Sequence, residues 1–364
     1  MTNRLDSLIH ELKRNDLDSI FVTSKANVYY LSGYYTDPHE RVVAVYVSQS
    51  DDPVLIVPAM EVNDAKDAGW NYDMIGYHDH ENVWELFLNH LNKSKLPESM
   101  GLEHDHFTLE RYESLKKILP TTHLKNATNI LANMRVIKSK QEYTLLKQAA
   151  SLADFGVETG VNAIKEGISE LDIIATIEYE LKKQGVQEMS FSTMVLSGGK
   201  TASPHGTPDQ TKIQKGDMVL FDLGVVFEGY CSDITRTVAY HSISDEQQQV
   251  YETVLKAEQK AIEACKVGVP VGKLDQIARD HIGEAGYGEY FTHRIGHGLG
   301  IDVHEYPSMH GENELPLQEG MCFTIEPGIY VPNVGGVRIE DMIFMTDKGA
   351  ESLTTYPKEL QIIK

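Results

Sequence analysis

Two segments of this chain place acidic side chains inside apolar sequence of the kind that forms buried strands. In the first, residues 218–225 form an apolar run that only Asp222 interrupts, and residues 229–238 can return as a partner strand. A four-residue loop at 226–229 predicts that Asp222 lies directly opposite Asp233. Two carboxylates that close repel each other, so one would be protonated unless cations lie between them. An aspartate in a turn and another on an exposed strand face would explain this stretch equally well.

The second segment, residues 321–344, repeats the pattern and favours burial. It reads as an apolar strand, a loop and another apolar strand, with Glu326 in one arm and Glu340 in the other. The paired glycines at 335–336 ease the turn. Burying an ionised carboxylate is costly unless it is paired or binds a metal ion. Two hairpins with an acid in each apolar arm are difficult to explain as solvated faces, so we expect these acids to be ligands.

A glycine-rich segment with three histidines, THRIGHGLGIDVHE at residues 292–305, lies between the two pairs of acids. Its glycines at 296, 298 and 300 would let the backbone approach another group closely. His297 is the natural fifth ligand in this segment.

Four carboxylates and one imidazole, without a thiolate, suit Mn²⁺, Fe²⁺ or Co²⁺ better than a structural zinc site. Four negative charges also match two divalent cations. A pair of metal ions roughly 3.5–4 Å apart can share a hydroxide near neutral pH. We therefore predict two divalent ions per subunit, Mn²⁺ first, with Co²⁺, Fe²⁺ or Zn²⁺ as alternatives.

The length of 364 residues predicts two domains, because one hydrophobic core rarely serves so long a chain. Residues 1–130 alternate short apolar runs with helical patterns, which predicts a small α/β domain. Its expected strands are 19–24, 42–47 and 53–58, and its expected helices include 81–93 and 108–118. We place the boundary near residue 130, so that residues 131–364 form a second domain that begins with a long helix at about 141–164.

The second domain contains a weak internal repeat, in which residues 163–185 resemble residues 264–286. Each copy reads as a helix end, a glycine, a Leu-Asp pair near a helix start, an amphipathic helix and a closing glycine. Ser169 and Asp172 form a plausible capping pair for the first of these helices. Two α+β halves related by pseudo-symmetry would place a site between them. Two unrelated amphipathic helices would look as similar, so both interpretations stay open.

Charge and composition bear on partners and location. The net charge of −21 argues against nucleic acid and anionic membrane as partners. No run approaches the roughly 18 apolar residues of a membrane span. The first residues lack an apolar signal core, and the apolar positions 5, 8, 9 and 12 mark one face of an amphipathic helix, which predicts a cytoplasmic protein. Three widely spaced cysteines match neither a disulfide framework nor a zinc ribbon.

The chain resembles the dinuclear metallopeptidases of the pita-bread fold, peptidase family M24, which include methionine aminopeptidase, aminopeptidase P and prolidase. The resemblance lies first in the ordered set of five candidate ligands, Asp222, Asp233, His297, Glu326 and Glu340. Further family motifs match RVIKSKQEY (135–143), SGGKTASPHGTPD (197–209), GHGLGIDVHE (296–305), EPGIY (326–330) and GGVRIED (335–341). The segments NVYYLSGY (27–34) and PVLIVPAME (53–61) are similar to the creatinase-like N-terminal domain of prolidases and aminopeptidase P. The length and TDPHER (36–41) are most similar to short bacterial Xaa-Pro dipeptidases.

This resemblance implies a creatinase-like N-terminal α/β domain followed by a pseudo-symmetric pita-bread metallopeptidase domain. It also implies that Asp233 and Glu340 bridge two metal ions. Asp222 would complete the ligands of one ion, and His297 and Glu326 those of the other.

The resemblance assigns substrate-side roles as well. His205 matches the family histidine that contacts the substrate near the leaving nitrogen, and His304 matches the one that hydrogen-bonds the substrate carbonyl or carboxylate. Arg338 matches an arginine of the site, and Tyr330 matches a tyrosine near the metal ions. Arg294 could recognise the free carboxylate of a dipeptide.

The implied reaction is hydrolysis of an Xaa-Pro dipeptide by a hydroxide that bridges two metal ions, with Glu326 moving a proton toward the proline nitrogen. The implied assembly is a homodimer, in which the loop at Asp37–Arg41 could reach the partner's site. Aminopeptidase P, which acts on longer peptides, is the nearest alternative. A binding module without catalysis would usually have lost ligands, and a dinuclear phosphatase would use more histidines.

Overall fold

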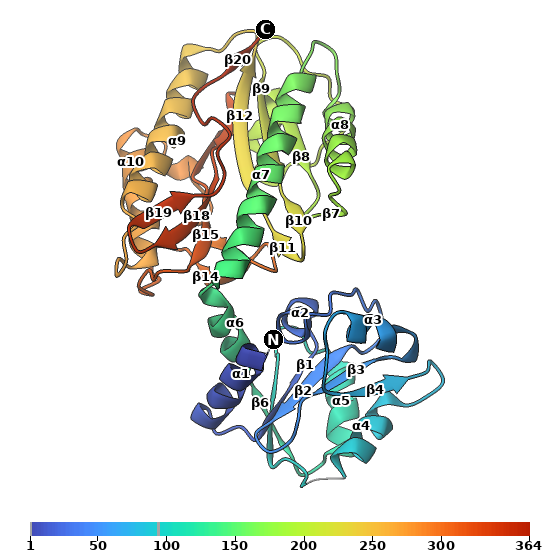
Figure 1. The fold of residues 1–364 in the computed structure, drawn as a ribbon. Helices are drawn as coiled ribbons and strands as arrows, with labels where there is room; N and C mark the ends of the chain where they lie inside the picture. Colours follow the sequence, from blue (N-terminus) through green and yellow to red (C-terminus); the bar gives the residue numbers. More distant parts are fainter. Residues whose placement is uncertain (1, 93–94) are drawn as a thin grey trace. The chain divides into compact units, whose positions relative to one another are not determined.

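The computed structural model describes residues 2–92 and 95–364 (Figure 1). The chain forms two compact units, residues 1–134 and residues 135–364. Each unit has its own sheets and its own hydrophobic core.

The first unit is built on one six-stranded sheet with the order β4-β3-β2-β1-β5-β6. Its strands are β1 (Ser19–Val22), β2 (Ala44–Ser48), β3 (Val54–Pro58), β4 (Asp73–Tyr77), β5 (Ser99–Leu102) and β6 (His123–Asn126). The pairs β1–β2 and β2–β3 are antiparallel, and the other neighbours are parallel. The three strands predicted from the sequence are confirmed as β1, β2 and β3.

Helices surround this sheet (Figure 1). They are α1 (Thr2–Arg14), α2 (Lys25–Ser32), α3 (Val62–Asp67), α4 (Val83–Leu91), α5 (Leu109–Ile118) and α6 (Thr128–Val136), with the short turn η1 (Ala59–Glu61). The helices predicted at 81–93 and 108–118 are confirmed as α4 and α5, although residue 93 lies outside the described residues. The core includes an aromatic cluster, in which the ring centroid of Phe87 lies 5.0 Å from that of Phe21 and 5.1 Å from that of Tyr46.

The second unit combines four long helices with two main sheets. The helices are α7 (Lys140–Ala163), α8 (Glu170–Lys183), α9 (Asp245–Glu263) and α10 (Val271–Glu284), with the short turns η2 (Gly198–Ala202) and η3 (Gly288–Tyr290). One sheet has the order β20-β12-β9-β8, from β8 (Met194–Ser197), β9 (Met218–Leu223), β12 (Ile234–Tyr240) and β20 (Ile362–Ile363). The other has the order β14-β13-β15-β18-β19, from β13 (His297–Gly298), β14 (Glu305–Ser308), β15 (Cys322–Ile325), β18 (Asp341–Thr346) and β19 (Gly349–Ser352). Smaller pairings involve β7 (Glu188–Met189), β10 (Val225–Phe227), β11 (Tyr230–Cys231), β16 (Gly328–Val331) and β17 (Gly335–Arg338).

The internal repeat is a true structural duplication. The pair α7–α8 precedes one main sheet, and the pair α9–α10 precedes the other (Figure 1). Just before α8, Ser169 forms an isolated antiparallel bridge with Lys212, and just before α10, Pro270 forms the corresponding bridge with Pro316. The capping pair of Ser169 and Asp172 is present at the start of α8. The second copy begins with proline instead, so the two copies share topology more closely than capping chemistry.

The first acidic hairpin has a different register from the one that the sequence suggested. The turn has two residues, Glu228 and Gly229, both with positive φ (47° and 77°), because Phe227 pairs with Tyr230. Thr235 therefore lies opposite Asp222. The prediction that Asp222 faces Asp233 across one rung is wrong, since Asp233 lies two residues before the true partner, at the break between β11 and β12.

The second acidic hairpin keeps one register along its length, although its ladder is interrupted. Ile325 pairs with Asp341 in β15–β18, and Gly328 pairs with Arg338 in β16–β17. Glu326 and Glu340 occupy the interruption between these two short ladders. Gly335, at the turn, has a φ of 129° that favours glycine, as the sequence suggested.

The closely spaced glycines of residues 296–300 approach the chain itself. A Cβ atom on Gly296 would lie 2.0 Å from the carbonyl oxygen of Thr324, and one on Gly298 would lie 2.4 Å from that of Tyr306. These contacts pack the segment tightly between β15 and β14, which fixes the backbone on either side of His297.

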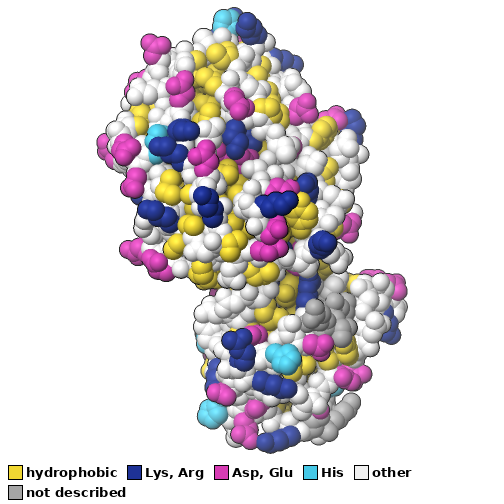
Figure 2. Space-filling view, turned by 60° about the vertical axis from the view of Figure 1, so that its left-hand side comes forward, with side chains coloured by type: hydrophobic (Ala, Val, Ile, Leu, Met, Phe, Trp, Pro, Cys, Tyr) yellow, Lys and Arg dark blue, Asp and Glu magenta, His cyan; other side chains and the backbone are white. Residues whose placement is uncertain are grey.

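No helix in the described part of the chain combines the length and the apolar character that a bilayer crossing needs. On the face shown in Figure 2, basic side chains alternate with acidic ones, and they do not form a continuous basic surface. This distribution agrees with the strongly negative net charge.

We expect the substitution Gly296→Ala to lower the free energy of unfolding by about 1–3 kcal/mol, because the new methyl group would overlap the Thr324 carbonyl. Differential scanning calorimetry measures the effect. The control is Gly283→Ala in α10, where a Cβ atom meets nothing within 4 Å and helix propensity predicts a gain of up to about 1 kcal/mol. Equal melting temperatures for the two variants would contradict this packing.

Candidate metal centre

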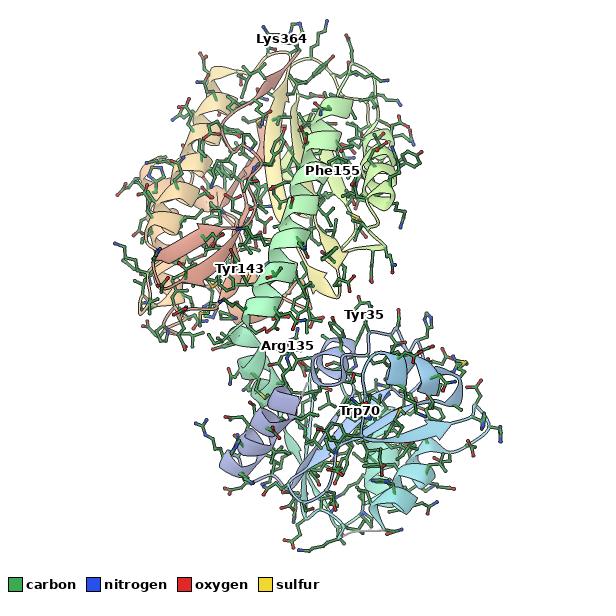
Figure 3. The ribbon with its side chains drawn as sticks, viewed as in Figure 1. Tyr35, Trp70, Arg135, Tyr143, Phe155 and Lys364 are labelled. Carbon is green, nitrogen blue, oxygen red and sulfur yellow. The ribbon has the colours of Figure 1, made fainter. Side chains whose placement is uncertain are left out.

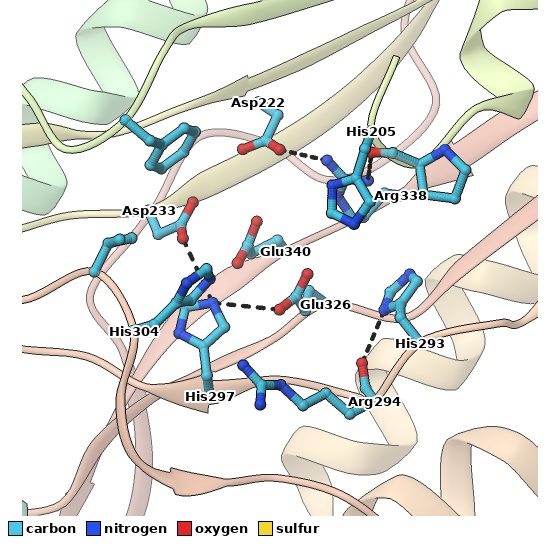
Figure 4. A pocket seen from close by; sticks show the side chains of 13 residues that line it. His205, Asp222, Asp233, His293, Arg294, His297, His304, Glu326, Arg338 and Glu340 are labelled. Atoms are coloured by element: carbon cyan, nitrogen blue, oxygen red, sulfur yellow. Dashed lines mark hydrogen bonds and ion pairs between the residues drawn. The ribbon is translucent and has the colours of Figure 1, made fainter. Parts of the chain in front are cut away.

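One cavity of the second unit, about 350 Å³ in volume, gathers the candidate site residues (Figure 4). All five predicted ligands line it, namely Asp222, Asp233, His297, Glu326 and Glu340. The predicted substrate-side residues His205, Arg294, His304 and Arg338 line it as well. The remaining lining residues are Phe191, Pro204, His293 and Val303.

Interrupted ladders explain how strand residues can turn their carboxylates toward one point. Asp233 directly precedes β12, Glu326 directly follows β15, and Glu340 directly precedes β18. The backbone N–H of Glu326 donates to Ile295 at 2.8 Å, and that of Glu340 donates to Thr235 at 3.1 Å. These two N–H groups stay paired outside the regular ladder, so Glu326 and Glu340 can leave it without losing a backbone hydrogen bond, whereas the Asp233 N–H donates to Met342 Sδ at 3.4 Å.

Three of the predicted ligands form a compact cluster. Side-chain oxygen or nitrogen atoms of Asp233, His297 and Glu340 all lie within 4.8 Å of one another. His297 Nε2 lies 3.7 Å from Asp233 Oδ2 and 3.4 Å from Glu326 Oε1. Figure 4 shows these side chains pointing toward the same space.

Two carboxylate oxygens in this cluster lack the partners that burial normally requires. Asp233 Oδ1 and Glu340 Oε1 are buried without a hydrogen-bond donor, whereas Glu340 Oε2 accepts from the Thr235 hydroxyl at 2.7 Å. Burial, followed by repulsion among the neighbouring acids, raises the pKa of Asp233 and of Glu340 well above the ordinary range. Burial also raises the pKa of Glu326, to about 7. The site therefore has a strong affinity for positive charge.

The imidazole of His297 is prepared to act as a ligand. Burial lowers its pKa to about 3, so the ring is neutral at physiological pH. Nδ1 lies 3.1 Å from the carbonyl oxygen of Gly298, and a proton on Nδ1 leaves the Nε2 lone pair directed at the carboxylates. Unpartnered carboxylate oxygens and a neutral imidazole are the donors that divalent cations of the Mn²⁺, Fe²⁺ and Co²⁺ type bind, so this set of residues fits such ions.

Arg338 forms the rear wall of the site. Its Nη2 donates to Asp222 Oδ2, and its Nε donates to the Thr235 hydroxyl at 3.1 Å. The guanidinium therefore offsets part of the negative charge of the acids and fixes the position of Asp222.

Tyr330 lies behind the cavity wall and does not line the cavity. Its hydroxyl accepts from Arg338 Nη1 at 2.9 Å and lies 2.9 Å from His293 Nε2. His293 belongs to the same histidine-rich segment as His297, but its sequence context predicts no particular role. Burial lowers the pKa of His293 to about 4, so a neutral ring faces the cavity.

Arg294 and His304 border the same side of the cavity as His297 (Figure 4). Arg294 Nη1 donates to the Ser308 hydroxyl at 2.8 Å, which holds the guanidinium in place. The ring of His304 packs edge-on against His297, with centroids 4.1 Å apart.

His205 enters the cavity from a separate loop that follows η2. Buried Glu170, at the start of α8, anchors this loop by accepting from Lys200 Nζ at 2.6 Å and from the Asp209 N–H at 3.0 Å. Ser197 adds a further backbone bond to Glu170 at 2.8 Å.

Comparison with known proteins agrees with this geometry. The family model described as "Metallopeptidase family M24" matches residues 144–347, which contain all five predicted ligands. The chain belongs to metallopeptidase family M24. A second model, described as "Creatinase/Prolidase N-terminal domain", matches residues 4–137. The M24 family implies divalent metal ions, and the carboxylate and histidine cluster is where this M24 chain would hold them.

Relatives align with this M24 protein over nearly all of its length. The proposed dipeptidase YkvY of Bacillus subtilis is 53% identical over 362 residues, covering 99% of this chain and 100% of its own. The prolidase from Pyrococcus horikoshii OT3 superposes with a TM-score of 0.92 at 36% identity, over 99% of this chain and 100% of that one. The Xaa-Pro dipeptidase from Bacillus anthracis gives 0.93 at 32% identity, over 100% and 99% of the two chains. An X-Pro aminopeptidase from Thermotoga maritima gives 0.88 at 30% identity, over 97% and 100%.

The loop at Asp37–Arg41 belongs to the first unit. There Arg41 pairs with Asp79, through a 2.9 Å bond from Nε to Oδ1, and Asp37 accepts from the His39 N–H at 3.1 Å. A role for this loop in a partner's site stays a prediction.

We expect the metal-free protein to lose stability as pH rises from 7 to 8.5. Asp233, Glu326 and Glu340 have raised pKa values when folded, whereas unfolded carboxylates titrate near pH 4. The folded state therefore keeps protons that the unfolded state has lost, and this stabilisation disappears as pH rises through the folded pKa values. Buried histidines have the opposite effect, but only below about pH 6.5. Melting temperatures of chelator-treated protein provide the measurement.

Two comparisons test the origin of this pH dependence. Asp233→Asn removes one of the clustered acids and should flatten the slope, whereas Asp245→Asn, at an exposed position in the first turn of α9, should leave it unchanged. A melting temperature that stays level or rises with pH in the metal-free protein would contradict the clustering.

Proposed function

We propose that this chain is a metal-dependent Xaa-Pro dipeptidase. The observation that carries the proposal is the convergence of all five predicted ligands on one cavity that is also bordered by Arg294 and His304. The whole-length similarity to a prolidase and to an Xaa-Pro dipeptidase supports it. The cytoplasmic location, the homodimer and the reach of the Asp37–Arg41 loop belong to the same proposal.

The five residues would hold two divalent cations, with Mn²⁺ as the first choice. When bound, such ions polarise a peptide carbonyl and activate a water molecule. Within this set, Asp233 and Glu340 would each offer an unpartnered buried carboxylate oxygen to the ions.

Glu326 would be the proton carrier. It lines the cavity beside the other predicted ligands, and Thr324 Oγ1 donates to its Oε1 at 3.3 Å. The nitrogen of an Xaa-Pro bond carries no hydrogen, so it must gain a proton before proline can leave. Glu326 would take this proton from the attacking water and deliver it to the proline nitrogen, and His205 would contact the substrate near that nitrogen.

His304 and Arg294 would bind the carboxylate end of the substrate. Both line the cavity, and Arg294 is held by Ser308 in a fixed position. A fixed guanidinium matches the planar carboxylate of a C-terminal proline. In a longer peptide this carboxylate is replaced by an amide, which leaves the guanidinium unpaired, so the site would select dipeptides.

Aminopeptidase P activity is the second candidate, favoured by the similarity to the X-Pro aminopeptidase of Thermotoga maritima. That fold similarity does not distinguish the two activities, because both share the ligand set. The distinction depends on the groups that face the substrate's C-terminal side.

We expect manganese-loaded protein to release proline from Ala-Pro and to act poorly on Ala-Pro-Ala and on Ala-Pro amide. A kcat/KM about 10- to 150-fold lower for the tripeptide would reflect loss of one charge-assisted contact, roughly 1.5–3 kcal/mol. Equal kcat/KM values for the dipeptide and the tripeptide would favour aminopeptidase P, and inactivity toward all three peptides would refute both activities.

We expect Arg294→Met to raise KM for Ala-Pro and to lower kcat/KM by about 100-fold, because the substrate carboxylate would lose its cationic partner. Hydrolysis of Ala-Pro amide should change little in the same variant, since that substrate has no carboxylate to lose. Ser308→Ala, which only frees the guanidinium, should have a smaller effect. An equal fall in kcat/KM for Ala-Pro and for Ala-Pro amide would show that Arg294 does not bind the substrate carboxylate.

A further inference from the structure

A group of buried charged side chains does not line the cavity but includes the residue that follows His304 in the chain. Its members are Arg135 near the end of α6 (Figure 3), Lys138 just before α7, and Glu305 at the start of β14. Their side chains are 9%, 2% and 4% exposed. Lys138 Nζ lies 2.9 Å from Glu305 Oε2, and Arg135 Nη2 contacts Glu305 Oε1. Arg135 also reaches Asp302 at 2.8 Å.

The carboxylate of Glu305 organises the loop that precedes it. Its Oε1 accepts from the backbone N–H of Ile301 at 2.7 Å and from that of Asp302 at 3.1 Å. A Cβ atom on Gly300 would lie 2.6 Å from the same oxygen, so glycine is required there for the carboxylate to fit. Burial by itself raises the pKa of Glu305, but Lys138 and Arg135 outweigh it and lower that pKa to about 2.

This loop connects directly to the groups of the proposed reaction. It begins after His297 and ends at His304. The carbonyl oxygen of Gly300 accepts from the Cys231 N–H at 2.7 Å, two residues before Asp233. A change in the conformation of residues 299–305 would therefore shift two predicted ligands, His297 and Asp233, and the substrate-side residue His304.

Stability alone is a weak explanation for this cluster. Taking several charges out of water costs about as much as their mutual attraction returns, and apolar replacements of buried ion pairs are often neutral or stabilising. The arrangement of the donors is more informative, because two cations and two backbone N–H groups converge on one carboxylate whose own residue adjoins His304.

We propose that Arg135, Lys138 and Glu305 are positioning residues that set the geometry of the metal centre and of His304 through the loop at residues 299–305. The proposal gives a structural role to the RVIKSK segment, residues 135–140. This segment lies far from the predicted ligands in the sequence and does not line the cavity. The effect on catalysis rests on the proposed dipeptidase activity, whereas the effect on metal binding does not.

The test compares Glu305→Gln with Glu103→Gln. Glu103 is a matched control because it is a buried carboxylate of the first unit that accepts from the backbone N–H groups of Thr23 and Ser24. We expect both variants to melt at lower temperature. Only Glu305→Gln should weaken Mn²⁺ binding to the metal-free protein, by about tenfold or more in calorimetric titration, and speed hydrogen exchange of peptides covering 297–305. It should also lower kcat/KM for Ala-Pro by a similar factor.

Unchanged Mn²⁺ affinity and unchanged exchange of 297–305 in a folded Glu305→Gln protein would overturn the proposal. If the wild type binds Mn²⁺ but does not cleave Ala-Pro, the dipeptidase assignment fails while the binding and exchange measurements still decide the positioning role. Should Glu305→Gln fail to fold, Lys138→Met provides the same three measurements, with a smaller expected loss because Arg135 remains. Lys138→Arg, which retains the charge, should restore Mn²⁺ affinity to within about threefold of the wild type. The proposal would also be overturned if Lys138→Met bound Mn²⁺ as tightly as the wild type, or if Lys138→Arg bound it as weakly as a weakened Lys138→Met.

Discussion

The second unit depends on bringing several carboxylates together out of water. Burial and mutual repulsion act on Asp233, Glu326 and Glu340 at once, and the direction of all three pKa shifts shows that this arrangement opposes ionisation. Arg338 offsets one charge, which leaves an excess of negative charge that divalent cations would neutralise. Burying several carboxylates close together raises the free energy of the folded state. The fold must therefore hold these side chains rigidly, because mobile side chains would move apart and become hydrated.

The internal duplication supplies that rigidity. Each half contributes one acidic hairpin, and the two hairpins meet where Thr235 and Glu340 form an antiparallel bridge. Thr235 is the central residue of this junction, because its carbonyl pairs with the Glu340 backbone while its hydroxyl bonds both the Glu340 carboxylate and Arg338. Ligands from opposite halves are thereby fixed relative to one another by a few short hydrogen bonds.

The substrate-side groups lie on loops, and buried charge anchors two of these loops. Glu170 holds the loop of His205 through Lys200, and Glu305 holds the loop of His304 through Lys138 and Arg135. Loops that lack regular ladders need such contacts, because their backbone groups otherwise have no fixed partners. The predicted metal ligands therefore lie near strand ends, whereas the predicted substrate-side groups lie on loops that ion pairs hold in place.

The sequence by itself indicated the candidate ligands and the two acidic hairpins, because acids inside apolar strands are local patterns. It left open whether the repeated helix signals meant a duplication. It did not determine the register of the first hairpin, since a turn with positive φ at Glu228 is unfavourable for a residue with a side chain and only the surrounding sheet imposes it. The contacts of His293 with Tyr330 and of Lys138 with Glu305 join residues 37 and 167 positions apart in the chain. Only the tertiary structure decided them, because the partner of a buried polar group depends on which segments packing brings together.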